Sequence, residues 1–363
     1  MTGAGRPLAG WRGAGVAVVL AVGACGGDAA PAGDGGLDAA PAGWSSGPSL
    51  PRPLSDNAVA ALPRAGGCEL YTVAGIEAGL DQAALTTAAF AWTSDQAGWR
   101  TLPAVPGPPR LAASAVGLRG RVYVVGGYTV SPTGAEASLD RVDVWDPAAA
   151  GWTTAAPLPV PIDDAVVAPW RDRYLLVVSG WSTTQPVRTV QLYDAEADAW
   201  TVADPFPGRP VFGHAGAISG DDVVIVDGVA AGAGGFALAP QAWRGHLDPA
   251  SPGVIAWTDL GGHPGPGRYR AAAGVDRAGA VVIVGGTDEP YNFDGRAYAT
   301  GQPSPPRADG LAYTRDGGFA AIADAPVATM DHRGLVGCGD ALAVVGGLVA
   351  GPAVTDGVRL LRR

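Results

Sequence analysis

The chain has 363 residues, of which 56 are Gly and 32 are Pro, and nearly half of all residues are hydrophobic. This composition is too apolar for a disordered chain and too rich in Gly for a helical protein, so we expect an all-β body with many turns. The net charge of -10 argues against a nucleic-acid-binding protein, because phosphate contacts need a basic surface. The chain contains no Lys, which excludes both a Schiff-base lysine and the lysine of a P-loop.

The N-terminus has the features of an export signal. Two Arg residues precede an apolar run over residues 13–24, which is too short to cross a bilayer as a helix. The run ends in Val-Gly-Ala-Cys at Cys25, which resembles the lipobox of bacterial lipoproteins, where the Cys becomes the lipidated first residue. A soluble periplasmic protein that is cleaved nearby is the alternative. We therefore expect a lipoprotein signal peptide over residues 1–24, lipidation at Cys25, and a flexible tether over residues 25–43.

A unit of about 50 residues recurs from residue 44 to residue 363. Its clearest copy, residues 110–161, has four short β-rich segments separated by Gly, Asp and Pro turns, which is the pattern of a four-stranded antiparallel sheet. The second segment of each copy ends in a pair of small residues. These pairs are Ala74-Gly75, Gly126-Gly127, Ser179-Gly180, Asp227-Gly228, Gly285-Gly286 and Gly346-Gly347. The pairs predict six blades.

Aromatic residues give a second marker of the repeat. In three copies an aromatic residue on the third segment precedes a Trp on the fourth by seven residues: Trp92 and Trp99, Trp145 and Trp152, Tyr193 and Trp200. Period and markers resemble the kelch family, in which the Gly pair lets neighbouring backbones approach and the aromatic residues pack between blades. The predicted fold class is therefore all-β, with residues 44–363 forming a six-bladed kelch-type β-propeller.

The two ends of the repeat region are each incomplete. The sixth copy lacks a fourth strand, whereas residues 44–54 precede the first complete copy as a strand without a partner. We expect the two ends to complete one blade, because closure of the ring removes an open sheet edge. Closure also brings Cys68, in the first blade, near Cys338, in the sixth. We expect a disulfide between them, with two buried free thiols as the alternative.

Antiparallel connectivity places the loops before the first strands and the loops between the second and third strands on one face of the ring. Polar residues at the start of each innermost strand should therefore surround the mouth of the central channel. These residues are Asn57, Arg110, Asp163, Asp164, His214, Arg268, Arg270, Asp331, His332 and Arg333. One interpretation is that part of this set binds an anionic ligand, namely Arg110, His214, Arg268, Arg270 and Arg333. The alternative is that the Arg side chains form structural ion pairs with the neighbouring Asp side chains and hold the blades together.

The longest loop on this face, residues 287–310, carries Glu289 and Tyr291. Here the last two blades resemble the bacterial kelch-type N-acetylneuraminate epimerases (mutarotases), whose penultimate blade has a similar insertion with Tyr and Glu after its Gly pair. The resemblance implies that Glu289 is a base and that an Arg holds the sugar carboxylate. Such a reaction also needs an acid that passes a proton, for which Tyr291 and His332 are the candidates. It implies no cofactor.

The sequence lacks the residues that a copper-radical or other metal site would need. Copper-radical oxidases that share the propeller need a Tyr crosslinked to Cys and two His ligands, whereas the four His residues here are scattered along the chain, so we expect no metal site. Two functions remain. The first is a binding or interaction module for an anionic glycan or protein ligand at the cell envelope, on the periplasmic or outer-membrane face, held to the membrane only by its lipid. The alternative is a cofactor-independent mutarotase of an acidic sugar.

Overall fold

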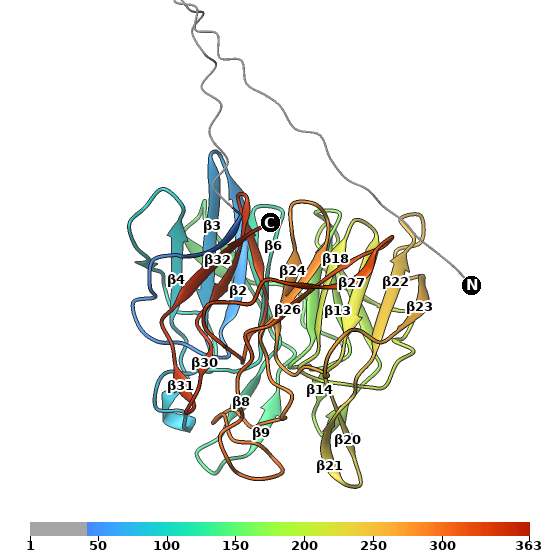
Figure 1. Cartoon of the computed structure of the whole chain (residues 1–363). Helices are drawn as coiled ribbons and strands as arrows, with labels where there is room; N and C mark the ends of the chain where they lie inside the picture. The colour runs from blue at the N-terminus through green and yellow to red at the C-terminus, as the bar shows by residue number, and fades with distance from the viewer. Residues whose placement is uncertain (1–41) are drawn as a thin grey trace, which may run out of the picture. The chain divides into compact units, whose positions relative to one another are not determined.

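The computed structural model describes residues 42–363 as a ring of six four-stranded antiparallel sheets (Figure 1). The predicted six-bladed β-propeller is confirmed. The expected signal peptide, the lipidation site Cys25 and nearly all of the expected tether lie outside the described residues. The described part contains no α-helix, only a short 3-10 helix, η1 (Gln82–Ala84), and therefore no helix that could span a membrane.

Each blade runs from an innermost strand at the channel to an outermost strand at the rim. From inside to outside, the first three blades are β2 (Ala58–Arg64), β3 (Gly67–Val73), β4 (Ala89–Thr93) and β5 (Arg100–Thr101); β6 (Ser114–Leu118), β7 (Arg121–Val125), β10 (Val142–Asp146) and β11 (Gly151–Thr154); and β12 (Val166–Trp170), β13 (Tyr174–Val178), β16 (Val190–Asp194) and β17 (Ala199–Ala203).

The last three blades follow the same order. They are β18 (Ala215–Ser219), β19 (Asp222–Val226), β22 (Ala242–Leu247) and β23 (Ile255–Gly261); β24 (Ala272–Val275), β25 (Val281–Val284), β26 (Gly310–Thr314) and β27 (Gly318–Ile322); and β28 (Val336–Cys338), β29 (Ala341–Val345), β32 (Val358–Arg362) and β1 (Gly43–Ser46). The innermost strands β2, β6, β12, β18, β24 and β28 contact one another in turn around the ring.

The hydrophobic core lies between the blades, and the burial of the second strands shows this. Every residue of β19, β25 and β29 is buried, because a neighbouring blade packs on each face of the sheet. These strands therefore read as continuous apolar runs. The outermost strand β17 faces solvent and exposes most of its residues.

The N-terminal strand closes the ring, as predicted. Strand β1 pairs antiparallel with β32, with Gly43 opposite Arg362 and Ser46 opposite Arg359. Next to this blade, Cys68 on β3 and Cys338 on β28 form a disulfide with their Cα atoms 5.0 Å apart. Blade six is thus built from both ends of the described chain, and a covalent bond links it to blade one.

The Gly pairs hold the loops that carry the mouth residues. Both members of the second pair have positive φ, 61° at Gly126 and 92° at Gly127. A Cβ at Gly127 would lie 2.6 Å from the carbonyl oxygen of Leu111, in the loop before β6. Only Gly permits this approach, and it fixes the loop against the end of β7.

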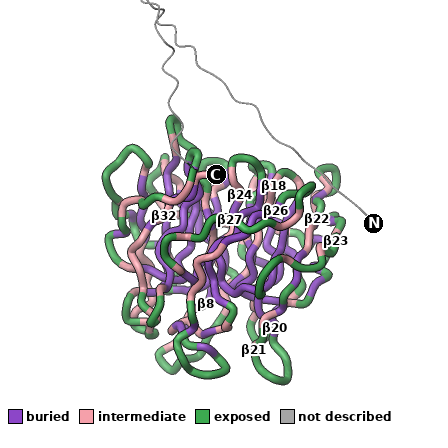
Figure 2. Tube along the Cα trace, in the orientation of Figure 1, coloured by how far each residue is buried: buried purple, intermediate pink, exposed green. Residues whose placement is uncertain are grey.

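Loops between the second and third strands carry four small hairpins: β8–β9 (Tyr128–Val130 and Glu136–Ser138), β14–β15 (Trp181–Ser182 and Gln185–Pro186), β20–β21 (Val229–Gly232 and Gly235–Leu238) and β30–β31 (Leu348–Val349 and Ala353–Val354). Figure 1 shows β8–β9, β20–β21 and β30–β31 on the same face of the ring, which is the mouth. Their outer parts are largely exposed, in contrast to the buried blades (Figure 2).

Candidate functional site

Six equivalent positions, one before each innermost strand, surround the axis at the mouth. All have a left-handed backbone with φ between 50° and 69°: Asp56, Ala112, Asp164, Gly213, Arg270 and Asp331. Backbone hydrogen bonds join neighbouring members, since the N–H of Gly213 donates to the oxygen of Asp164 and that of Arg270 to the oxygen of Gly213. The repeat thus places four charged residues in a ring of fixed backbone.

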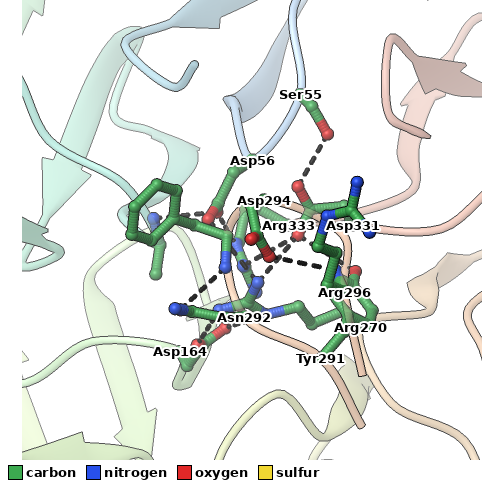
Figure 3. Close-up of polar contacts among 12 residues, drawn as sticks. Ser55, Asp56, Asp164, Arg270, Tyr291, Asn292, Asp294, Arg296, Asp331 and Arg333 are labelled. Atoms are coloured by element: carbon green, nitrogen blue, oxygen red, sulfur yellow. Dashed lines mark hydrogen bonds and ion pairs between the residues drawn. The ribbon is translucent and has the colours of Figure 1, made fainter. Parts of the chain in front are cut away.

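Two guanidinium groups hold the three carboxylates of this ring together. We call Asp56, Asp164, Arg270, Asp331 and Arg333 the axial ion cluster (Figure 3). Arg270 Nη2 lies 2.6 Å from Asp164 Oδ2, and its Nη1 lies 3.0 Å from Asp331 Oδ1. Arg333 pairs with both Asp56 and Asp164. All five side chains are at most 4% exposed, so the cluster is a buried structural element.

The cluster contains one more carboxylate than guanidinium groups. Burial raises the pKa of Asp56 to about 6, and the charge of Asp331 adds to the rise while Arg333 and Arg270 oppose it. Burial also disfavours the charged form of Asp164, but Arg270 and Arg333 outweigh it and hold the pKa of that carboxyl below its usual range. Asp56 Oδ2 has no hydrogen-bond partner among the described residues. Arg333 Nη2 likewise has no hydrogen-bond partner there, although it lies 3.6 Å from Asp331 Oδ1.

The axial ion cluster separates two spaces. On one side the innermost strands enclose the central channel, a space of about 300 Å³ lined mainly by small residues and by Asp164, His214, His332 and Arg333. On the other side is a space of about 190 Å³, which we call the mouth cavity. Asp164 lines both spaces, whereas Arg333 faces the channel and Arg270 the mouth cavity.

Residues of blades two to five build the mouth cavity. It is lined by Tyr128, Glu136, Ser138, Asp163, Asp164, Trp181, Thr183, Phe212, Phe236, Arg270, Asn292 and Tyr298. The hairpins β8–β9, β14–β15 and β20–β21 each contribute, as does the loop between β25 and β26. The mouth loops of four blades therefore converge on one cavity, and the loop over residues 287–310 that the sequence singled out is one of them.

One wall of the mouth cavity is aromatic. The ring centroid of Trp181 lies 5.3 Å from that of Phe212 and 5.8 Å from that of Phe236, both in edge-on arrangements. The ring of Phe236 lies 4.5 Å from that of Tyr298. Tyr298 is 39% exposed, so this wall is open to solvent at its outer end. Such a surface stacks on flat or apolar faces of a ligand.

Carboxyl groups also line the mouth cavity. Asp163 accepts a hydrogen bond of 2.6 Å from the hydroxyl of Ser138, and burial, with the like charge of Asp164, raises its pKa well above the usual value. Glu136 forms no ion pair within the described part of the chain. Burial raises its pKa as well, although Arg270 opposes the shift. Three carboxylates and one guanidinium group line this small space.

Two of the Arg residues predicted to bind a ligand lie elsewhere, which corrects that expectation. Arg110 is completely buried, and its Nη2 donates to Asp143 Oδ2 at 2.7 Å. Arg268 is 1% exposed and lies 2.5 Å from Asp309. Each guanidinium turns away from the axis toward an acidic residue near the third strand of its own blade, so neither lines the mouth cavity.

The two remaining Arg residues, Arg270 and Arg333, form the ion pairs of the alternative interpretation. The predicted mouth residue Asn57 is off by one position, because Asp56 occupies the ring. The amide of Asn57 instead donates to Thr72 Oγ1 and to the carbonyl oxygen of Val345.

Both predicted His residues face the channel. His214 Nε2 lies 2.9 Å from the carbonyl oxygen of Val178, and His332 Nε2 lies 2.9 Å from Thr329 Oγ1. Burial lowers the pKa of each ring to about 4, so both are neutral near pH 7. Neither ring lines the mouth cavity, and the roles of His214 in ligand binding and of His332 in proton transfer stay predictions.

The predicted catalytic pair is also outside the mouth cavity. Glu289 is partly exposed, and its Oε1 is 3.5 Å from the hydroxyl of Thr300. Tyr291 is completely buried and donates a hydrogen bond of 3.1 Å to Asp331. Neither side chain lines the mouth cavity, because the blade-five loop presents Asn292 and Tyr298 to it instead.

The sequence analysis did not predict that Glu136, Trp181 and Phe236 line the mouth cavity. A signal existed for Trp181, since it follows the Gly pair of blade three just as Tyr128 follows that of blade two. No comparable pattern marks Glu136 or Phe236, which lie in hairpins of different length.

Comparison with known proteins supports the repeat assignment. Residues 109–159 match the family model described as Kelch motif. The chain is 26% identical over 175 residues to human Kelch repeat and BTB domain-containing protein 13, which covers 48% of this chain and 36% of the relative. It is 27% identical over 199 residues to mouse Kelch-like protein 35, covering 52% of this chain and 30% of the relative. The chain thus spans about a third of the length of these curated relatives.

Solved structures share the fold at low sequence identity. The structure of YjhT aligns with a TM-score of 0.68 and 16% identity over 85% of this chain and 95% of that one. A fungal alcohol oxidase of the AA5 family in complex with copper aligns with a TM-score of 0.58 and 16% identity, over 84% of this chain and 62% of that one. Among residues 42–363, His, Cys, Asp and Glu side chains form no group of three that could hold a metal ion.

Proposed function

Because the chain carries a Kelch motif on a six-bladed kelch-type propeller, we propose that it is a ligand-binding module whose ligand enters the mouth cavity. One observation carries the proposal: side chains from four blades build a cavity of about 190 Å³ that combines an aromatic wall with hydrogen-bonding groups. Sites for small ligands have this mixture of apolar area and a few polar groups. The volume suits one sugar ring of a glycan or one side chain of a protein ligand.

The charges of the mouth cavity bear on the ligand class. An anionic ligand would need a free guanidinium group, and Arg270 is instead held by Asp164 and Asp331. The carboxyl groups of Glu136 and Asp163 accept hydrogen bonds when they are ionised, so they favour hydroxyl or N–H groups on a ligand. The geometry therefore favours a glycan or protein ligand with hydrogen-bond donors over an anionic ligand.

Substitution of Trp181 by Ala tests the binding function. We expect it to weaken the strongest ligand found on a glycan and peptide array by about tenfold or more, because aromatic anchors dominate binding in desolvated sites. The matched control is Trp152→Ala on β11, a partly exposed Trp outside the mouth cavity. Equal loss of affinity in both variants, or no loss in either, would contradict the site assignment; circular dichroism checks that both variants fold.

The cellular location is part of the same proposal. The apolar run that ends at Cys25 supports export and lipid anchoring at the cell envelope. The Cys68–Cys338 disulfide supports it independently, since such bonds persist in oxidising compartments. Mass spectrometry of the mature protein should find an N-terminal, diacylglycerol-modified Cys25, and an unmodified N-terminus would contradict the anchor.

A mutarotase of sugars is the second candidate, and Glu136 is the observation that favours it. A general base works best when its pKa is near the working pH, and burial shifts the pKa of Glu136 in that direction. Tyr128 and Tyr298 line the same cavity and carry hydroxyl groups that can relay a proton. In this arrangement Glu136 takes the role that the sequence assigned to Glu289.

NMR measurement of anomer exchange separates the two carboxylates. If the protein is a mutarotase, Glu136→Gln should slow the catalysed exchange of a reactive sugar by about 100-fold or more, because the base is lost, whereas Glu289→Gln should leave it nearly unchanged. The reverse result would restore Glu289 as the base. Exchange no faster than in buffer, for neutral, amino and acidic sugars alike, would leave binding as the function.

A further inference from the structure

The walls of the mouth cavity carry more carboxyl groups than guanidinium groups. Of its four charged lining residues, Glu136, Asp163 and Asp164 are acidic and only Arg270 is basic. Arg270 contacts Asp164 through two nitrogen atoms, so these two residues neutralise each other. Glu136 and Asp163 remain without a cation among the described residues.

The aromatic wall adds a second, independent feature. Trp181, Phe236 and Tyr298 line the cavity together with these carboxyl groups. Aromatic rings carry negative charge on their faces and attract cations, most strongly when water is excluded. The aromatic rings and the carboxyl groups therefore both favour a positive charge on the ligand.

We propose that the mouth cavity selects ligands with a positively charged, carbon-substituted nitrogen, the ammonium group lying between Glu136 and the aromatic wall. This inference rests on the proposed binding function and names its ligand class. An amino sugar and a choline-type head group share this chemistry. A neutral ligand of the same shape would gain only the stacking contacts, and an anionic ligand would meet two carboxyl groups without compensation.

Protonation of the carboxyl groups in the mouth cavity should make the affinity for a cationic ligand depend on pH. The groups that face Glu136 are Asp163, Asp164 and Arg270, together with the hydroxyls of Tyr128 and Tyr298. Because burial raises the pKa of Glu136, its carboxyl group becomes protonated at a higher pH than that of an exposed Glu. A bound cation favours the ionised carboxylate, so affinity should rise with pH through this raised pKa and fall as the carboxyl group becomes protonated.

Isothermal titration of the folded protein with matched probes tests the ligand class. Choline, whose charge does not depend on pH, is compared with 3,3-dimethylbutan-1-ol, its neutral isostere; glucosamine is compared with N-acetylglucosamine. We expect the charged member of at least one pair to bind about tenfold more tightly at pH 7, where the amino group of glucosamine is still largely protonated. The choline pair and the sugar pair distinguish the two sources of the ammonium group. Choline binding, if present, should weaken as the pH is lowered and Glu136 becomes protonated.

Glu136→Gln should remove most of the preference for the charged probe and leave the neutral probe unaffected. The control is Glu77→Gln, which removes a carboxylate from a mouth-side loop where Glu77 pairs with Arg52 outside the cavity. Equal affinity for both members of each pair, or no binding of any charged probe, would overturn the inference. If neutral ligands bind and Trp181→Ala abolishes their binding, the proposed function stands although its ligand class does not.

Discussion

Arg270→Met is expected to destabilise the propeller by about 3–5 kcal/mol, because removal of one partner leaves buried carboxylates uncompensated. Asp164 and Asp331 each bond to Arg270, and both side chains are at most 3% exposed. The variant should unfold at a clearly lower urea concentration than the parent, monitored by tryptophan fluorescence. A change at this residue therefore acts on folding, whatever it does to a ligand.

The matched control for this prediction is Arg171→Met. Arg171 also pairs through two nitrogen atoms with one carboxylate, that of Asp221, but its side chain is 49% exposed. Water replaces the lost contacts there, so its unfolding midpoint should change little. If Arg270→Met unfolds at the same urea concentration as the parent, the axial ion cluster is not the structural element that its geometry indicates.

Deletion of residues 42–54 is expected to prevent folding or to cause aggregation. Strand β1 supplies the outermost strand of blade six, and Trp44 packs against the core between blades five and six. Without β1, the edge of β32 is open to pairing with other chains. Size-exclusion chromatography and circular dichroism of the truncated protein measure the effect.

A shorter deletion provides the comparison. Removal of residues 26–41, which lie outside the described part, leaves β1 intact and should preserve the melting temperature. A monomeric 55–363 fragment that melts at the parent temperature would show that closure by the N-terminal strand contributes nothing to stability.

The fold was predictable because its signals are local and repeated six times. Gly pairs, strand-length apolar runs and regularly spaced aromatic residues each mark one place in a blade, and ring closure follows from the two incomplete ends. Cys68 and Cys338 could be placed in adjacent blades by the same reasoning. Strand β1 begins at Gly43, one residue before the expected start of the repeat region.

The site was less predictable because the direction of a side chain does not follow from the position of its strand. Arg110, Arg268 and Arg270 all precede an innermost strand, yet only Arg270 points toward the axis. The difference depends on acidic residues distant in sequence, such as Asp143 and Asp309, which draw the other two guanidinium groups into the blades. Periodicity alone does not reveal such pairs.

Loop conformation accounts for the other errors. Glu289 was assigned to the mouth because its loop is long and lies on the correct face. The loop instead folds so that Tyr291 is buried against Asp331 and Tyr298 reaches the cavity. Glu136, the first residue of β9, lines the mouth cavity where Glu289 was expected, and nothing in its local sequence distinguishes it from an ordinary surface residue.

A crystal structure of the protein with the strongest ligand from the array tests the central proposal most directly. We predict ligand density in the mouth cavity, stacked on Trp181 and Tyr298 and within hydrogen-bonding distance of Glu136, while Arg270 keeps its contacts with Asp164 and Asp331. Density for the ligand in the central channel or at the outer rim of the blades, with the mouth cavity empty, would contradict the proposal.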